Sequence, residues 1–347
     1  MKGLRKYLAP FAPDQSGASA VLSDLGGIIV ICDAGGCAGN ICGFDEPRWF
    51  MKKSAIFSAG LRDMDAILGR DDRLVAKLSD AAGKVEASFA AIIGTPVPAV
   101  IGTDYKALGR MTEKKTGLPV ITVDTDGMEL YDVGQEKAYL ALFKAFAVEK
   151  LPVEAGRIGI LGATPQDVSD LRFTEKIKVA LYKEKIICYG MGDGLDAVKM
   201  ASAAEKNLVI SPSGLAAARY LQERFGTPYE VCYPLVKELI PEDGYDYTGK
   251  KVLVVHQQVI ANAIRDEIRT RGGAEVTVGS WFSMSPELKE EGDINLKEED
   301  DFMELVEKGG WDVIFADGCM ARMIPQFTGK FVNVTHFAVS GKLRRQG

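Results

Sequence analysis

Three cysteines at a constant spacing form the densest group of chemistry-bearing residues in the sequence. Cys32, Cys37 and Cys42 follow one another at intervals of five residues, and glycines occupy much of the loop between them. Thiolates ligate iron in iron–sulfur clusters, and glycines let the backbone approach a bulky group closely. The spacing matches neither the ferredoxin patterns nor the paired cysteines of a zinc site. From the residues alone, three interpretations stay open: a metal cluster, buried core thiols, or a redox or nucleophilic cysteine.

A second group of polar residues follows apolar stretches that resemble buried strands. Ligands of open parallel sheets bind beyond the carboxyl ends of the strands, so these positions are candidates for a pocket. Ser211, His256 and Asp193 each stand at or just beyond the end of such a stretch. Ser211 also has a plainer interpretation, because Ser-Pro commonly begins a helix with the serine as N-cap. His336 is expected to be a hydrogen-bonded structural residue.

Several common types of site have no motif here. The sequence contains no Walker A motif, so we do not expect ATP to bind through a P-loop. Gly190 to Gly194 matches a dinucleotide-binding loop only in part, and no Gly-x-Ser-x-Gly elbow is present. The chain has only two histidines, which disfavours a histidine-rich zinc or non-haem iron site.

Composition and charge narrow the classes of partner. The 347 residues carry a net charge of −6 without long basic runs, so nucleic acid is not an expected partner. No apolar stretch reaches the length of a signal peptide or a membrane span, which predicts a cytoplasmic protein that does not bind membranes. In that compartment the six cysteines indicate thiols or metal ligands more than disulfides.

Short runs rich in Val and Ile recur along the chain, each followed by a glycine-containing loop and a stretch with helical spacing. This alternation is typical of βαβ units and predicts parallel sheets. The clearest unit has strands at 251–255, 274–278 and 311–316, with a helix over 259–268. A solvated loop and helix start are expected over 287–301. The remaining expected strands cover residues 27–32, 55–58, 90–93, 120–123, 157–161, 185–189 and 207–210.

Two polar, turn-rich segments divide this series of strands. They lie at 149–152 and 241–244, where few contacts are expected to cross. The sequence therefore predicts an α/β protein with three successive Rossmann-like domains and mostly parallel sheets. The predicted domains are 1–150, which carries the cysteine loop, 151–245 and 246–347.

Segments in order over nearly the whole chain resemble the component 1 family of nitrogenase and nitrogenase-like reductases. This family includes dark-operative protochlorophyllide reductase and the nickel-sirohydrochlorin reductive cyclase. Residues 34–38, Ala-Gly-Gly-Cys-Ala, resemble the family's Gly-Pro-x-Gly-Cys cluster loop. The other segments that carry the resemblance are 57–74, 96–105, 118–127, 192–194 and 207–211.

The resemblance implies a three-domain subunit that pairs with itself or with a homologous component 1 subunit. A separate iron protein, which binds and hydrolyses the ATP, would deliver electrons to a [4Fe–4S] cluster shared at the subunit interface. Cys37 matches the cluster cysteine of the family, with Cys42 as the preferred second ligand and Cys32 in reserve. The implied surroundings of the cluster are the amides of Gly35, Gly36 and Gly39, with Thr95 and Asp45 nearby.

Departures from the family pattern restrict the implied chemistry. Thr95 stands where the family often has a further cluster cysteine, and Ser211 stands where nitrogenase has the cysteine that anchors its large metal cofactor. Dinitrogen reduction is therefore not expected. The predicted function is an oxygen-sensitive, nitrogenase-like oxidoreductase subunit of an anaerobe that reduces an unsaturated small molecule, with a tetrapyrrole as one candidate. Two alternatives stay open: a non-catalytic scaffold or carrier for metal-cofactor assembly, and a metal-free protein that binds a small ligand.

Overall fold

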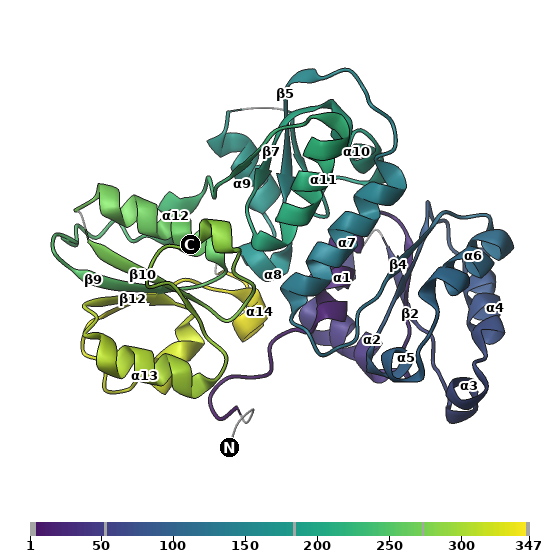
Figure 1. Ribbon diagram of the computed structural model, residues 1–347, viewed down its shortest axis with the longest axis horizontal. Helices are drawn as coiled ribbons and strands as arrows, with labels where there is room; N and C mark the ends of the chain where they lie inside the picture. The colour runs from purple at the N-terminus through teal and green to yellow at the C-terminus, as the bar shows by residue number, and fades with distance from the viewer. Residues whose placement is uncertain (1–4, 52–53, 183–184, 273, 345–347) are drawn as a thin grey trace.

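Three parallel sheets follow one another along the chain and surround a pair of central helices (Figure 1). The structure is a computed structural model that describes residues 5–51, 54–182, 185–272 and 274–344. Every strand pairing between the named strands is parallel, as the repeated βαβ pattern predicts. Over these residues, no helix combines the length and the apolar character needed to cross a membrane.

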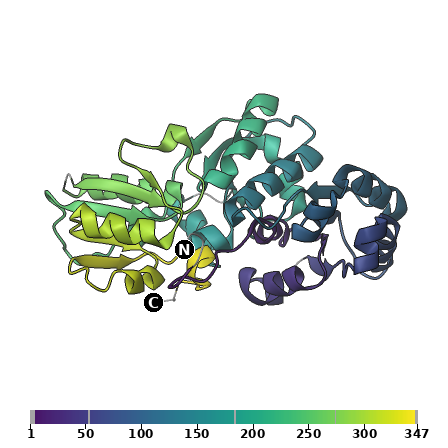
Figure 2. The same ribbon diagram turned by 60° about the horizontal axis from the view of Figure 1, so that its bottom comes forward.

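The first sheet has four strands in the order β2-β1-β3-β4. Its two central strands are buried along their whole length, which explains their unbroken runs of apolar residues. Figure 2 shows this part of the chain as a purple and blue lobe at one end of the molecule. Its strands are β1 (Ile28–Ile31), β2 (Ala55–Ser58), β3 (Ala90–Ile93) and β4 (Val120–Val123). Its outer helices are α3 (Asp63–Leu68), α4 (Asp71–Ala82), α5 (Pro96–Ile101) and α6 (Tyr105–Thr116).

The second sheet also has four strands, in the order β6-β5-β7-β8. Three of them coincide with expected strands, whereas the short edge strand β8 was not anticipated because it begins with a half-buried tyrosine and an exposed glutamate. The strands are β5 (Glu154–Leu161), β6 (Ile186–Cys188), β7 (Ala204–Val209) and β8 (Tyr229–Val231). The helices are α8 (Pro165–Val168), α9 (Phe173–Ala180), α10 (Leu195–Lys199) and α11 (Leu215–Phe225).

The third sheet has five strands in the order β11-β10-β9-β12-β13. The segment expected to be a solvated loop contains the two-residue strand β11 before its helix begins, so that expectation holds only in part. The strands are β9 (Lys251–Val255), β10 (Glu275–Ser280), β11 (Ile294–Asn295), β12 (Val313–Ala316) and β13 (Lys330–Asn333). The helices are α12 (Gln258–Thr270), α13 (Glu299–Gly309) and α14 (Phe337–Ser340).

Two helices in contact, α1 (Asp14–Leu22) and α7 (Tyr131–Phe146), lie between the first sheet and the other two (Figure 1). They approach so closely that only glycine fits at two positions. A Cβ atom on Gly17 would lie 1.8 Å from the carbonyl oxygen of Tyr131, and one on Gly134 would lie 1.8 Å from that of Asp14. This contact joins the core of the first sheet to that of the second.

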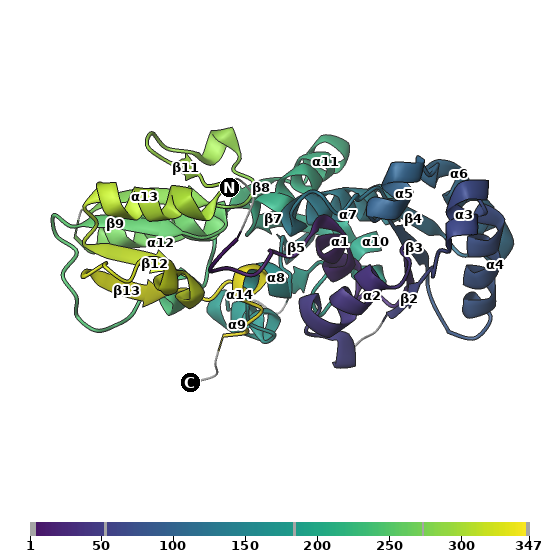
Figure 3. The same ribbon diagram turned by 90° about the horizontal axis from the view of Figure 1, so that it is seen from below.

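The N-terminal segment leaves the first lobe and packs against the third sheet. Leu8 and Phe11 belong to the hydrophobic core beside β9 and β12. The carboxylate of Glu299 accepts hydrogen bonds of 2.7 Å from the backbone amides of Lys6 and Leu8. Figure 3 shows α14 beside α8, so the end of the described chain also returns to the centre of the molecule. The three sheets match the predicted order of domains, and the exact domain boundaries stay a prediction.

Candidate functional site

The cysteine loop begins where β1 ends. Cys37 lies in the first turn of α2 (Gly36–Asn40), and Cys42 lies in the π-helical turn η1 (Ile41–Asp45) that continues it. Both thiols are half-buried, whereas Cys32 is buried and belongs to a hydrophobic core. Burial raises the pKa of Cys32 to about 12, which favours the protonated thiol. All six cysteines lie in the described part of the chain, and none of them forms a disulfide there.

The glycines beside Cys37 keep one side of this loop open. Gly35 adopts a φ of 122°, which disfavours any residue with a side chain. A Cβ atom on Gly36 or on Gly39 would have no heavy atom of another part of the chain within 4 Å. These glycines are exposed, so a bulky group can reach the backbone around Cys37 from outside.

Polar side chains fix the cysteine loop and its surroundings through hydrogen bonds. Asp33 accepts hydrogen bonds from the amide of Ala38 at 2.8 Å and from Ser58 Oγ at 2.5 Å. Thr95, the predicted neighbour of a cluster, donates its hydroxyl to the carbonyl oxygen of Cys32 at 2.6 Å and so ties the ends of β1 and β3 together. Asp45 accepts a hydrogen bond from Ser16 Oγ at 2.6 Å. Both predicted neighbours therefore have structural partners within the chain.

Large apolar side chains are exposed at the same end of the first sheet. They follow the carboxyl ends of β1, β2, β3 and β4, which meet at one edge because the strands are parallel. Val100 is 86% and Met128 is 82% exposed. Figure 1 shows α2, α3 and α5 along this lower edge of the lobe. We call this surface the apolar edge, and it comprises Phe44, Met64, Ile67, Leu68, Val100 and Met128. Where exposed apolar side chains gather into one patch, they mark protein interfaces.

A buried arginine links the segment after the cysteine loop to the second sheet. Arg48 donates hydrogen bonds to the Glu46 carboxylate, to the carbonyl oxygen of Ala20 at 2.6 Å and to that of Gly190 at 2.8 Å. The glycine loop that begins at Gly190 thus supports the cysteine lobe. Asp193 lies in this loop, and its carboxylate accepts a hydrogen bond from the amide of Cys188 at 2.8 Å. The structure therefore places Asp193 in a turn, away from the other pocket candidates.

A buried carboxylate, Asp167, lies at the junction of the sheets. It stands on α8 after β5 and accepts hydrogen bonds from Ser211 Oγ at 2.8 Å, Tyr131 Oη at 3.1 Å and Thr164 Oγ1 at 3.1 Å. Burial raises its pKa to about 7, although hydrogen bonds from Ser211, Gln135, Thr164 and Tyr131 oppose this shift. Ser211 occupies an N-cap position, but its hydroxyl bonds to Asp167 and caps no backbone amide.

Two stacked histidines complete the junction on the side of the third sheet. The rings of His256 and His336 lie 4.1 Å apart at an interplanar angle of 10°. His336 Nε2 lies 2.9 Å from Tyr131 Oη, which connects the histidines to Asp167. Burial lowers the pKa of His256 to about 4 and that of His336 well below its ordinary value, so both rings are neutral at pH 7. Ser211 and His256, two of the three predicted pocket residues, therefore belong to one buried network.

The network reaches a pocket of about 210 Å³ through Ser213. Ser213 Oγ lies 3.2 Å from Ser211 Oγ and donates to Gln135 Oε1 at 2.8 Å. Asp132 lines this pocket, and its buried Oδ1 is one of the side-chain oxygens that have no hydrogen-bond partner among the described residues. The lining residues come from α7, the turn before α11, α11 itself and the loop after β10, and include Asp132, Glu136, Pro212, Ser213, Arg219 and Ser283.

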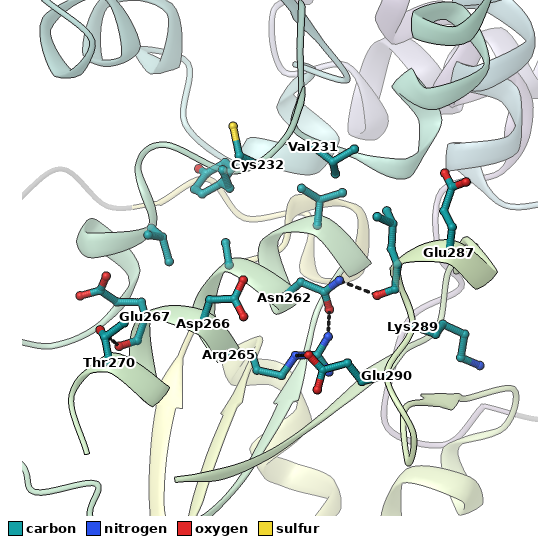
Figure 4. A pocket seen from close by; sticks show the side chains of 15 residues that line it. Val231, Cys232, Asn262, Arg265, Asp266, Glu267, Thr270, Glu287, Lys289 and Glu290 are labelled. Atoms are coloured by element: carbon teal, nitrogen blue, oxygen red, sulfur yellow. Dashed lines mark hydrogen bonds and ion pairs between the residues drawn. The ribbon is translucent and has the colours of Figure 1, made fainter. Parts of the chain in front are cut away.

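A larger pocket of about 530 Å³ lies between β8 and α12 (Figure 4). Several of its polar groups bond to one another. Arg265 donates to Asn262 Oδ1 and to Asp293 Oδ1, both at 2.7 Å, and Asn262 donates to the carbonyl oxygen of Leu288 at 2.8 Å. These bonds hold the loop after β10 against α12, which gives this pocket a structural explanation.

Comparisons with known proteins agree with this architecture. A family profile described as nitrogenase component 1 type oxidoreductase matches residues 14–236. The chain belongs to this family. The match includes Cys37 and Ser211, whereas His256 and His336 lie beyond it.

Individual relatives of this component 1 family chain are distant. It is 26% identical over 181 residues to the nitrogenase iron-molybdenum cofactor biosynthesis protein NifE of Clostridium pasteurianum. That match covers 50% of the chain but only 38% of the length of NifE.

Two solved structures share the fold over most of the chain. They are described as nitrogenase Cp1 at pH 6.5 and at pH 5, with TM-scores of 0.73 and 0.70. The first is 13% identical and covers 99% of this chain and 91% of that one, and the second is 15% identical and covers 95% and 84%. At these identities the likeness shows the component 1 fold alone.

The donor set of this component 1 family chain fits a cluster only in part. Within the described residues of one chain, no three His, Cys, Asp or Glu side chains form a group that could hold a metal ion. A cluster of four irons takes four cysteine ligands. The two half-buried thiols of the loop, Cys37 and Cys42, are at most two of these four ligands. Cys32 does not fit, because its thiol is buried among apolar side chains.

Asp167, the centre of the buried network, is not among the candidate residues that the sequence indicated. Asp167 lies in the short helix α8, a few residues after the end of β5. Polar residues that follow a strand of a parallel sheet are candidates for a ligand site, and this applies to Asp167 as it does to Ser211. That rule could have found Asp167. Tyr131 and Gln135 lie one turn apart on α7. No sequence pattern marks them as members of the network, because their hydrogen-bond partners come from distant parts of the chain.

Proposed function

We propose that this chain is the redox subunit of a nitrogenase-like reductase. In this proposal two component 1 subunits share a [4Fe–4S] cluster at the cysteine loop, and an unsaturated small molecule is reduced in the pocket beside Ser213. The observation that carries it is Cys37, a half-buried thiol among exposed glycines at the apolar edge. A second subunit, either identical or homologous, would cover this edge and complete the ligand set.

Cys37 and Cys42 are the proposed ligands in each subunit, which gives four thiolates for one cluster. Gly35, Gly36 and Gly39 leave the backbone accessible, so their amides are available to the sulfur atoms of a cluster. The cluster would supply low-potential electrons. A separate ATP-hydrolysing iron protein is the proposed electron donor, in keeping with the missing Walker A motif of this chain.

The pocket beside Ser213 suits a small substrate. Its volume of about 210 Å³ lies below the range of roughly 300–1,000 Å³ that drug-sized ligands occupy. Asp132 Oδ1 has no hydrogen-bond partner and would accept from a substrate N–H or O–H that enters beside it. Arg219 lines the same pocket, where its charge is paired with that of Glu287. A tetrapyrrole exceeds this volume, so such a substrate needs a widened pocket or additional space from the second subunit.

Anaerobic spectroscopy with two matched cysteine variants tests the cluster assignment. Wild-type protein should show a broad visible absorbance that dithionite bleaches. Cys37→Ser should lose this absorbance, because the remaining thiol cannot hold the cluster. Cys319→Ser, which changes a half-buried thiol in the helical turn after β12, should keep it. Retention of the bleachable absorbance in Cys37→Ser contradicts the assignment.

The likeness to NifE favours a second candidate function. That relative is named for iron-molybdenum cofactor biosynthesis. A scaffold or carrier for metal-cofactor assembly would share the cysteine loop and the apolar edge but would not turn over a substrate. A reducible cluster that transfers no electrons to any added substrate supports the scaffold, whereas absence of iron after reconstitution supports a metal-free ligand-binding protein.

A further inference from the structure

A chain of hydrogen-bonding groups connects Asp167 to the pocket beside Ser213. It runs from Asp167 Oδ1 to Ser211 Oγ over 2.8 Å, and from there to Ser213 Oγ over 3.2 Å. Asp167 and both serines are at most 2% exposed, while Ser213 lines the pocket. No water is needed to bridge these atoms, because each step is within hydrogen-bonding distance.

The direction of these hydrogen bonds depends on the charge of Asp167. Each serine hydroxyl has one proton to donate. With Asp167 ionised, Ser211 donates to the carboxylate and Ser213 donates to Gln135, so no proton lies between the serines. With Asp167 protonated, the carboxyl donates to Ser211, and the Ser211 proton turns to Ser213. Protonation therefore aligns Asp167 and Ser211 toward Ser213, and the Ser213 proton reaches the pocket when its hydroxyl turns away from Gln135.

We infer that Asp167 is the proton source of this pocket and acts through Ser211 and Ser213. One proton leaves the carboxyl group for Ser211, Ser211 passes its own proton to Ser213, and Ser213 passes its own to the anionic centre of the substrate. The electrons come from the low-potential iron–sulfur donor of the proposed function, on which the catalytic part of this inference rests. Between turnovers, water in the open pocket returns a proton to Asp167 along the same path.

The groups that face Asp167 are suited to this role. On α7 they are Tyr131 and Tyr139, with Asp132 acting on Tyr131, and from the third sheet His336 and His256 lie behind Tyr131. Both histidines are neutral at pH 7, so they offer no positive charge to the ionised carboxylate. The hydrogen bond from Tyr131 stabilises the ionised form, but burial outweighs it. The pKa of about 7 fits a group that holds and releases a proton at neutral pH.

Infrared spectroscopy of the purified protein tests the proton on Asp167 without cluster or substrate. Wild-type protein should show the C=O band of a buried protonated carboxyl, which disappears with a midpoint near pH 7. Asp167→Asn should lack this band, whereas Asp170→Asn, which changes a less buried carboxylate three residues later, should keep it. A wild-type spectrum without the band, or an Asp167→Asn spectrum that retains it, overturns the inference.

The path is tested by time-resolved infrared spectroscopy after a photochemical pH jump. Ser213→Ala leaves the carboxyl and its direct partners in place, so the midpoint should stay near that of wild type. Loss or gain of the band should slow at least tenfold, because the last hydroxyl is missing. Equal rates in wild type and Ser213→Ala overturn the path. If the proposed reductase function fails instead, no substrate is reduced, but these infrared results are unaffected.

Discussion

The cysteine loop around Cys37 and the buried junction around Asp167 place reactive groups in opposite environments within one fold. Around Cys37 the glycines are open, the apolar side chains are exposed, and the thiols of one chain are too few for a cluster. Around Asp167 the polar groups are buried and bonded to one another. In the proposed function a second subunit completes the loop, whereas the buried network around Asp167 is formed within one chain.

Arg48 ties the segment after the cysteine loop to α1 and to the loop after β6, and its loss should have the largest effect on stability. Arg48→Met leaves the buried Glu46 carboxylate and two carbonyl oxygens without their partner. We expect a loss of about 3–5 kcal/mol in the free energy of unfolding, measured by urea denaturation. Arg70→Met, which breaks an exposed ion pair with Asp72, should cost less than about 1 kcal/mol. Equal losses in both variants would contradict the importance of Arg48.

The glycines of the two regions should respond differently to a methyl group. Gly134→Ala places a Cβ against the carbonyl of Asp14 and should cost about 3 kcal/mol or prevent folding, because α1 and α7 must separate. Gly39→Ala meets no neighbour and should change stability by less than about 1 kcal/mol. Thermal unfolding of both variants measures the contrast. A stable Gly134→Ala protein would show that the helices can move apart easily.

The histidines should give the junction a defined dependence on pH. The pKa of His256 is about 4 in the folded chain against an ordinary value of 6.5, so the unfolded chain binds its proton first as the pH falls. The stability from neutral His256 is present above pH 6.5 and is lost toward pH 4, at about 1.4 kcal/mol per pH unit.

His256→Gln should remove the contribution of His256 to the slope of the free energy of unfolding between pH 6 and pH 5. Denaturant unfolding at each pH measures this slope. His336 contributes a slope of the same sign, and Asp167, whose pKa is raised, contributes the opposite sign; both remain in the variant. Parallel stability curves for wild type and variant would show that His256 is not held neutral.

The apolar edge should affect association much more than folding. Val100→Glu adds a charge to a side chain that is 86% exposed, so the free energy of unfolding should change by less than about 0.5 kcal/mol. Self-association, or association with a homologous subunit, should weaken at least tenfold in analytical ultracentrifugation. Val179→Glu on α9, 71% exposed and outside this edge, should leave association unchanged. Unaltered association of Val100→Glu would place the interface elsewhere.

The sequence predicted the strands better than it predicted the site. Central strands such as 90–93 and 251–255 are buried, so their continuous apolar runs identified them. Edge strands such as β13 were not predicted, because polar residues such as Lys330 and Asn333 interrupt their apolar pattern. The sequence placed Cys37 in an accessible loop because the neighbouring glycines, which indicate such a loop, are adjacent to it in the sequence. The stacking of His256 on His336 depends on the packing of separate elements, which spacing does not reveal.

The most direct test of the central claim is the iron and acid-labile sulfide content of anaerobically purified or reconstituted protein. A [4Fe–4S] cluster shared by two subunits predicts about two irons and two sulfides per chain, in a dimeric species. Four irons per monomeric chain, or no iron after reconstitution, would contradict a cluster shared across the apolar edge.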